Sequence, residues 1–177
     1  MKRKSMACLL VPCLSMVCCF GSPLTEIAYE AVNLGGERWQ YNYTVSNIGL
    51  AVAGQPAAIK EFTIWFDNAL YENPEILTPP PLAGAWDEIL LPPEPALGDP
   101  GAYDALAEAW NPGIGTGETA AGFSVAFDWL GTGRPGRQYY QIIDRDTFET
   151  LEDGFTIPEP AMIFLFSFGG FLIKRQK

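Results

Sequence analysis

The sequence predicts an all-β fold, an antiparallel β-sandwich, from three observations. Several segments alternate apolar and polar residues with a period of two, and the clearest one covers residues 37–47. Its apolar members are Trp39, Tyr41, Tyr43 and Val45. These segments are rich in aromatic and β-branched residues, which favour strands. Many of the 18 glycines and 15 prolines fall between them, where a sandwich needs turns.

The first half of the body predicts three strands, over residues 24–34, 37–47 and 57–67. The third alternates again, and its apolar face carries Phe62, Ile64 and Phe66. Because successive side chains of a strand point to opposite faces, Trp65 is expected to point away from that apolar face.

Residues 73–101 differ in composition from the rest of the body, because they hold eight of the fifteen prolines. Proline cannot donate to a strand ladder, so the pattern predicts a long surface excursion, with residues 86–91 at best a short edge strand. Asp99 and Pro100 then suit the N-cap and first turn of a helix. A short helix is therefore expected over residues 102–110.

Strands resume over residues 122–130 and 137–144, and the glycine-containing turn between them predicts a hairpin. One more short strand is expected within residues 147–156. Together these elements predict one domain over residues 22–157, an antiparallel β-sandwich of immunoglobulin-like type.

The last twenty residues have three parts in strict order. The motif Pro158, Glu159 and Pro160 comes first, and an apolar run over residues 161–173 follows it. The chain then ends in a basic tail that contains Lys174, Arg175 and Lys177. The apolar run predicts a C-terminal hydrophobic helix that is short of the roughly 20 residues needed to cross a bilayer comfortably. The basic residues would stay on the cytoplasmic side.

These three parts, over residues 158–177, resemble the PEP-CTERM sorting signal of exported bacterial proteins. The same tetrapeptide at residues 93–96 is not followed by an apolar run, so it is interpreted as loop. The resemblance implies an exosortase-type membrane protease as partner, transient membrane contact through the tail, and association with extracellular polysaccharide or other surface proteins. The alternative is an ordinary C-terminal anchor that is never cut.

The N-terminus predicts export. Residues 2–4 are basic, residues 6–20 are mostly apolar, and Cys19 and Gly21 are small residues at suitable cleavage positions. A signal peptide over residues 1–21 is expected, and with it a cell-surface or extracellular location after passage through the inner membrane. A lipoprotein signal is the alternative, although the usual order of residues before Cys18 is missing.

Composition limits the chemistry of the body. All four cysteines lie in residues 1–21 and the chain has no histidine, which excludes disulfides in the body, serine–histidine or cysteine–histidine catalysis, and ordinary zinc sites. Residues 22–157 hold five basic and twenty acidic side chains, a net charge of −15. This charge disfavours nucleic acid as a partner, because nucleic acid binding depends on basic contacts to phosphate.

Exposed aromatic rings near carboxylates and amides suggest glycan binding. The candidate contacts are Trp65, Trp86, Trp110 and Tyr139. The alternative is that the proline-rich excursion folds back and buries these rings.

Asp144, Asp146 and Glu149 place hard oxygen donors in a short stretch, which suggests a calcium site. The spacing of an EF-hand loop is absent. The alternative is a solvated hairpin edge whose charges discourage strand pairing. No other cofactor is expected.

The leading hypothesis is therefore an exported surface or matrix protein without a catalytic residue. A carbohydrate-binding module is the second hypothesis. The third is a carboxylate-based glycoside hydrolase, which needs two acids about 5 to 9.5 Å apart in a cleft. The acids available for it are Asp87, Glu88, Asp104, Glu108 and Asp128.

Overall fold

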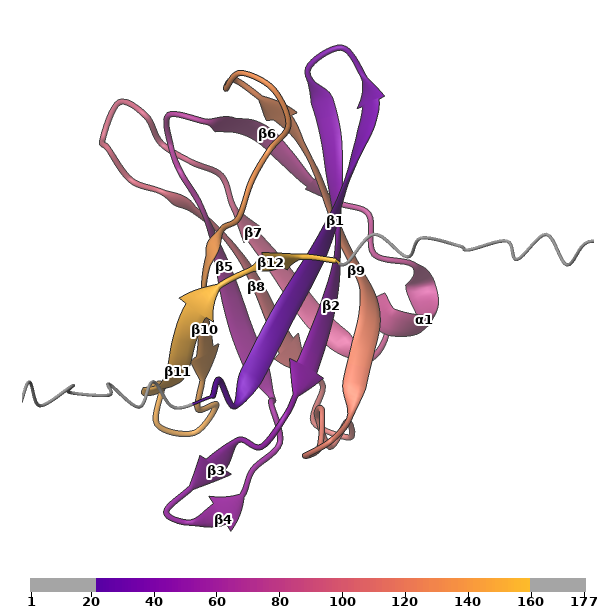
Figure 1. Ribbon diagram of the computed structural model, residues 1–177, viewed down its shortest axis with the longest axis vertical. Coiled ribbons are helices and arrows are strands. Elements are labelled where there is room, and N and C mark those ends of the chain that lie inside the picture. Colours follow the sequence, from indigo (N-terminus) through magenta and orange to yellow (C-terminus); the bar gives the residue numbers. More distant parts are fainter. Residues whose placement is uncertain (1–21, 160–177) are drawn as a thin grey trace, which may run out of the picture.

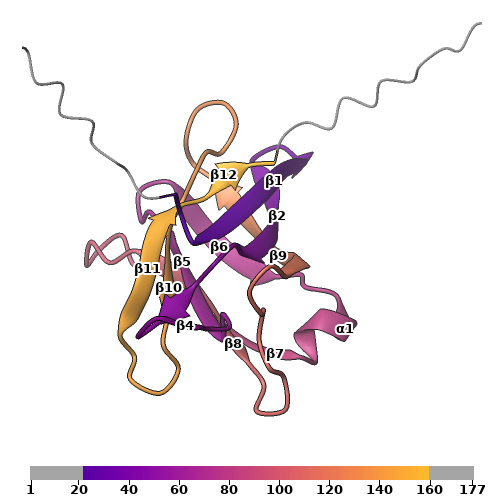
Figure 2. The ribbon, with the colours of Figure 1, turned by 60° about the horizontal axis from the view of Figure 1, so that its bottom comes forward.

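The computed structural model describes residues 22–159, which form two five-stranded sheets packed face to face (Figures 1 and 2). The first sheet has the order β12 (Ile157–Pro158), β1 (Thr25–Gly35), β2 (Arg38–Asn47), β9 (Thr119–Trp129) and β6 (Tyr71–Ile76). The second has the order β11 (Thr150–Phe155), β10 (Tyr139–Ile143), β5 (Glu61–Phe66), β8 (Gly101–Ala107) and β7 (Trp86–Leu91). The chain also forms a small hairpin of β3 (Ala51–Val52) and β4 (Gln55–Pro56), and one helical turn, α1 (Pro80–Ala83). The predicted all-β sandwich is confirmed.

The clearest alternating segment of the sequence, β2, is paired on both sides. Its Tyr41 lies opposite Ala31 of β1 and Val125 of β9, and all three side chains are buried. The polar residues between its aromatic residues face away from the second sheet. Period-two patterning thus fixes which face of the first sheet enters the core.

Aromatic rings fill the space between the sheets. Phe62 of the second sheet meets Phe123 of the first edge to face, with ring centroids 5.0 Å apart. Tyr41 and Phe127, neighbours within the first sheet, have centroids 4.8 Å apart. Such pairs contribute about 0.5–1.5 kcal/mol each beyond the area they bury. The Phe62–Phe123 contact joins the two sheets, and the Tyr41–Phe127 contact strengthens the inner face of the first.

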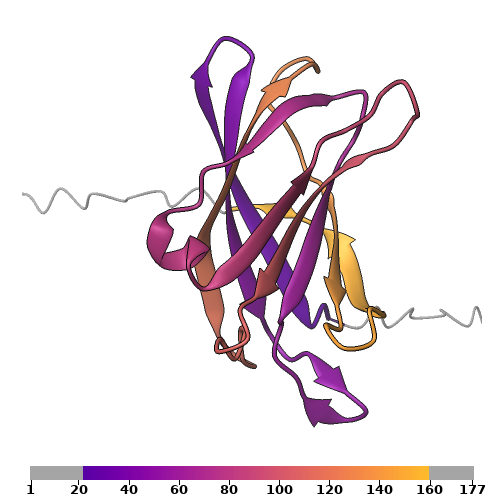
Figure 3. The same cartoon turned by 180° about the vertical axis from the view of Figure 1, so that it is seen from behind.

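The predicted excursion over residues 73–101 is only partly irregular. It contains the end of β6, then α1, then all of β7, and so carries the chain from one edge of the first sheet to an edge of the second (Figure 3). Pro74 lies at the register shift of β6, where no ladder donor is required. The prediction of a short edge strand over residues 86–91 is confirmed. The prediction of continuous loop around it is wrong.

The predicted helix over residues 102–110 is also wrong, because β8 occupies most of this segment. Its side chains alternate, with Tyr103 and Ala105 buried and Asp104 on the other face. The strand pairs with both β5 and β7, and this pairing outweighs the intrinsic helix preference of its alanines.

The predicted hairpin of residues 122–130 and 137–144 is wrong in its pairing, although both segments are strands. β9 belongs to the first sheet and β10 to the second, so the turn between them crosses from sheet to sheet. β10 pairs instead with β5 and with β11, which is the further strand expected within residues 147–156.

The end of the described chain lies on the first sheet. β12 pairs in parallel with β1, and the backbone N–H of Glu159 donates to the carbonyl of Tyr29 at 2.8 Å. The Thr44 hydroxyl donates to the Glu159 carboxylate, also at 2.8 Å. Pro158 and Glu159 are thus held against the domain.

Other predictions lie outside residues 22–159. These are the signal peptide over residues 1–21, Pro160, the apolar run, and the basic tail of Lys174, Arg175 and Lys177. Among the helices within residues 22–159, none is long and apolar enough to cross a membrane.

Candidate functional site

A pocket of about 470 Å³ lies at one end of the outer face of the second sheet. Its walls come from the end of β5, the turn after it and the first residue of β6, from the loop before β8, from the segment that leads into β10, and from the end of β11. The side chains that can contact a ligand there are Trp65, Asp67, Asn68, Arg137, Tyr139 and Phe155.

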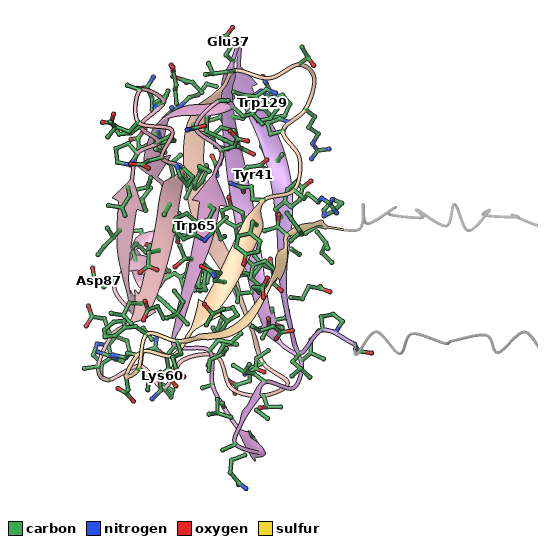
Figure 4. The ribbon with its side chains drawn as sticks, turned by 90° about the vertical axis from the view of Figure 1, so that its left-hand side faces the viewer. Glu37, Tyr41, Lys60, Trp65, Asp87 and Trp129 are labelled. Atoms are coloured by element: carbon green, nitrogen blue, oxygen red, sulfur yellow. The ribbon has the colours of Figure 1, made fainter. Side chains whose placement is uncertain are left out.

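Strand alternation puts three rings on this face, of which Trp65 and Tyr139 are half-buried and Phe155 is exposed. Ile64 and Phe66 are fully buried, so Trp65 between them points outward from β5 (Figure 4). Tyr139 precedes the buried Tyr140 and also points outward. It lies opposite Phe155 in the β10–β11 ladder, with ring centroids 5.7 Å apart.

Hydrogen bonds hold two of these rings in place. The indole N–H of Trp65 donates to the side-chain oxygen of Gln141 at 3.3 Å. The Tyr139 hydroxyl donates to the carboxylate of Asp153 at 3.0 Å. A ring that is already oriented loses little conformational entropy when a ligand stacks on it.

Three polar side chains complete the pocket. One carboxylate oxygen of Asp67 accepts the Ala69 N–H at 2.8 Å, which fixes the turn after β5. Asn68 follows it in the same turn. On the other side, the Arg137 guanidinium lies over the Phe155 ring, 4.6 Å from its centroid. Apolar rings with a few oriented polar groups are the usual composition of a small-molecule site.

Gln138 connects the pocket wall to the core. Its side-chain oxygen accepts the Tyr43 hydroxyl at 2.5 Å, and its backbone N–H donates to the hydroxyl of Thr156 at 2.8 Å. Burial raises the pKa of Tyr43, so this hydroxyl keeps its proton and remains a donor. Sequence reasoning missed Gln138, as it missed Asp67, Asn68 and Arg137. The only available signal was that all four flank strands that carry outward-facing aromatics.

The outer face of the first sheet is different. Along β2 its side chains are polar, and Gln40 donates to Ser124 of β9 at 2.8 Å and to Asn42 at 2.6 Å. No aromatic ring of β2 points to this face. The two outer faces of the sandwich are therefore chemically distinct, and the aromatic one holds the pocket.

The structure brings together two of the four predicted glycan contacts, Trp65 and Tyr139. Trp86 is only 4% exposed, and its ring packs on Phe62 and Phe123, so its predicted contact role is wrong. The alternative, in which the excursion folds back over the outer face and covers its rings, is not what buries Trp86, because β7 turns this ring inward between the two sheets. Trp110 is 70% exposed, but it follows the far end of β8 and lies outside the pocket.

The predicted calcium ligands do not form a site. One Asp144 oxygen accepts the backbone N–H groups of Asp146 and Thr147, at 2.8 and 2.9 Å. These bonds lower the pKa of Asp144 and turn its carboxylate inward to close the β10–β11 loop. Within residues 22–159, no group of three or more histidine, cysteine, aspartate or glutamate side chains could hold a metal ion. Asp146 and Glu149 therefore belong to an ordinary hairpin loop.

The carboxylates proposed for a hydrolase lie elsewhere. Asp104 accepts the Thr63 hydroxyl at 2.6 Å, and Glu88 accepts hydroxyls from Thr78 and Tyr103. Among the residues that the structure describes, the pocket is lined by one carboxylate, that of Asp67. The pocket thus lacks the pair of acids that glycoside hydrolysis requires.

No protein-family model matches the chain, and no curated protein matches it. Among solved structures, the chain is similar to a chain of the Coh-OlpA–Doc918 complex, a type I cohesin–dockerin complex from Clostridium thermocellum. The TM-score is 0.40 at 14% identity, over 77% of this chain and 99% of that one. It is also similar to the chitin-binding domain of Chi18aC from Streptomyces coelicolor, with a TM-score of 0.35 at 18% identity, over 66% of this chain and 89% of that one. Neither likeness is close enough to bear on function.

Proposed function

We propose that residues 22–159 form a carbohydrate-binding domain, and that the pocket around Trp65 and Tyr139 is its binding site. The observation that carries the proposal is the convergence of two outward-facing rings with Asp67, Asn68 and Arg137 in one hollow. The flat faces of sugar rings stack on aromatic side chains, while their hydroxyls bond to carboxylates, amides and guanidinium groups. The pocket supplies both kinds of contact, and β5 and β10 hold its rings rigidly.

We also propose, from the two ends of the sequence, that the protein is exported and sorted. A signal peptide over residues 1–21 would carry the chain across the inner membrane. The PEP-CTERM resemblance over residues 158–177 would hand it to an exosortase-type protease, which would leave the domain at the cell surface or in the extracellular matrix. A sugar-binding domain without catalytic machinery suits that location, because it can attach the protein to extracellular polysaccharide.

A protein partner is the second candidate, and one surface feature favours it. Ile89 and Leu91 of the edge strand β7 are 50% and 58% exposed on the same outer face as the pocket. An exposed apolar edge is suited to contact with another surface protein.

The direct test is binding of purified residues 22–159 to the extracellular polysaccharide of the cells that make the protein. This segment contains every described strand and the whole described core, and thermal unfolding followed by circular dichroism would establish that it is folded. We expect Trp65→Ala to weaken binding at least tenfold, since stacking on one ring contributes a large part of the affinity. Trp110→Ala is the matched control, because Trp110 is exposed but lies outside the pocket. Equal binding by both variants would exclude this pocket as the site.

Sorting is tested separately. The intact mass of native protein recovered from outside the cell is expected to lack residues 161–177. A mass that still includes Lys177 would contradict processing and would support the uncut anchor.

A further inference from the structure

The four arginines of the domain differ in their contacts. Arg38 pairs with Glu75 at 2.8 Å and with Asp128 at 3.2 Å. Arg134 and Arg145 donate to backbone carbonyls, at 2.8 and 3.0 Å. These three guanidinium groups make contacts that stabilise the folded domain.

Arg137 is different. Among residues 22–159 its guanidinium makes no hydrogen bond or ion pair, and it stacks on the Phe155 ring. Phe155 is itself 53% exposed and lines the pocket. A cation stacked on a ring keeps the N–H groups at its edge free. Within the part of the chain that the structure describes, Arg137 is thus oriented without an acceptor, and it is the only basic side chain that lines this pocket.

We propose that the pocket takes an acidic saccharide, a uronic acid or another sugar that bears a carboxylate. The inference rests on the proposed function and specifies its ligand class. The ligand carboxylate would pair with the edge of the Arg137 guanidinium, whose two parallel N–H groups match its geometry. The sugar ring would stack on Trp65 or Tyr139, and its hydroxyls would reach Asp67 and Asn68.

The net negative charge of the domain does not prevent an acidic saccharide from binding in this pocket. At physiological ionic strength, charges more than about 8 Å apart are largely screened, so the group in direct contact determines the local preference. No ion pair between Asp67 and Arg137 occurs in the described part of the chain, so the guanidinium is not neutralised within the pocket. One oxygen of Asp67 is also occupied by the Ala69 N–H. The ligand carboxylate therefore belongs at the Phe155 side of the pocket.

The experiment compares two forms of one ligand. The extracellular polysaccharide is used as isolated and after chemical reduction of its carboxyl groups to alcohols, which removes the charge and keeps the sugar backbone. Residues 22–159 are expected to bind the native form about tenfold or more tightly than the reduced form, as the loss of a charge-assisted hydrogen bond predicts. In Arg137→Gln this preference should disappear. Lys60→Gln changes the net charge by the same amount outside this pocket, and it should keep the preference.

The outcomes separate the two proposals. Equal binding of the native and reduced forms would overturn the acidic ligand and leave the carbohydrate-binding function in place. Binding of neither form would overturn both. A preference lost equally in Arg137→Gln and Lys60→Gln would show that overall charge, and not this pocket, selects the ligand, and it too would overturn the inference.

Discussion

The hydroxyl of Tyr43 donates a 2.5 Å hydrogen bond to the side-chain oxygen of Gln138. Tyr43 lies in β2, at the centre of the first sheet, whereas Gln138 directly precedes β10 of the second. The amide nitrogen of Gln138 also lies 3.4 Å from the carbonyl of Trp65, to which it donates. A single buried side chain therefore connects the first sheet to the strand that carries the stacking ring of the pocket.

Removal of the Tyr43 hydroxyl should destabilise the domain. Tyr43→Phe leaves the Gln138 oxygen buried without a donor, which costs about 1–3 kcal/mol. Urea unfolding monitored by circular dichroism would measure the loss. Tyr139→Phe is the matched control, because its hydroxyl bonds to Asp153 at the surface, and it should change the free energy of unfolding by about 0.5 kcal/mol or less. An equal decrease in the free energy of unfolding of the two variants would mean that the buried Tyr43–Gln138 hydrogen bond stabilises the domain no more than a surface one.

Truncation of the central ring of the core should be more severe. Phe62 is fully buried and touches Trp86, Tyr103 and Phe123. Phe62→Ala should lower the free energy of unfolding by about 3–5 kcal/mol, because it opens a cavity between the sheets. Phe148→Ala provides the comparison, since Phe148 is 77% exposed in the β10–β11 loop and its loss should have little effect. A loss below about 1 kcal/mol in Phe62→Ala would show that the two sheets can close over the missing ring.

Local patterning predicted the strands well and their partners poorly. The alternation in residues 37–47 correctly placed Tyr41 and Tyr43 inside, and the alternation in β5 correctly placed Trp65 outside. These results depend only on the two-residue period of a strand. The partner of a strand depends on contacts distant in sequence, so the expected β9–β10 hairpin was wrong even though both strands exist. The immunoglobulin-like type stays a prediction.

The wrong predictions for β8 and Trp86, and the pocket residues that were missed, also result from contacts distant in sequence. The alanines of β8 favour a helix in isolation, but β8 lies between β5 and β7, and ladder pairing determined its structure. Trp86 was expected to be exposed because it lies in the proline-rich segment, yet β7 turns its ring inward. Arg137 and Asp67 lie 70 positions apart, and only the fold shows that they line the same pocket.

The contribution of Asp104 to the stability of the domain should be larger at acid pH than at neutral pH. Burial is the main cause that raises the pKa of Asp104, and the neighbouring Asp87 adds to it, although the Thr63 hydrogen bond opposes both. A carboxyl group whose pKa is raised on folding stabilises the folded state fully below its unfolded pKa of about 3.9. That contribution is lost as the pH rises through the folded-state pKa. Stability from this group should therefore fall as the pH rises above about 4.

Asp104→Asn removes this titration while its side-chain oxygen can still accept the Thr63 hydroxyl. Relative to the wild type, the variant should gain stability as the pH rises from 4 to 7, as measured by urea unfolding at several pH values. Asp146→Asn, whose side chain is exposed in the β10–β11 loop, should follow the wild type. If the difference between Asp104→Asn and the wild type is the same at every pH, the assignment of this titration to Asp104 is wrong.

The contact between Thr44 and Glu159 predicts how firmly the chain end is held. Only two residues of β12 pair with β1. The position of Glu159 therefore depends largely on two hydrogen bonds, one from the Thr44 hydroxyl to its carboxylate and one from its own N–H to the Tyr29 carbonyl. Thr44→Val removes the hydroxyl but keeps a β-branched residue in the strand. Hydrogen exchange measured by mass spectrometry should then show faster exchange at the amide of Glu159. Ser46→Ala changes another hydroxyl on the same face of β2 and should leave that amide unchanged. If a sorting protease must bind the backbone groups of residues 158–160 that β1 occupies, β12 must leave β1 before cleavage, and Thr44→Val should also be processed faster in the cell. An unchanged exchange rate in Thr44→Val would show that the side-chain contact does not hold β12 in place.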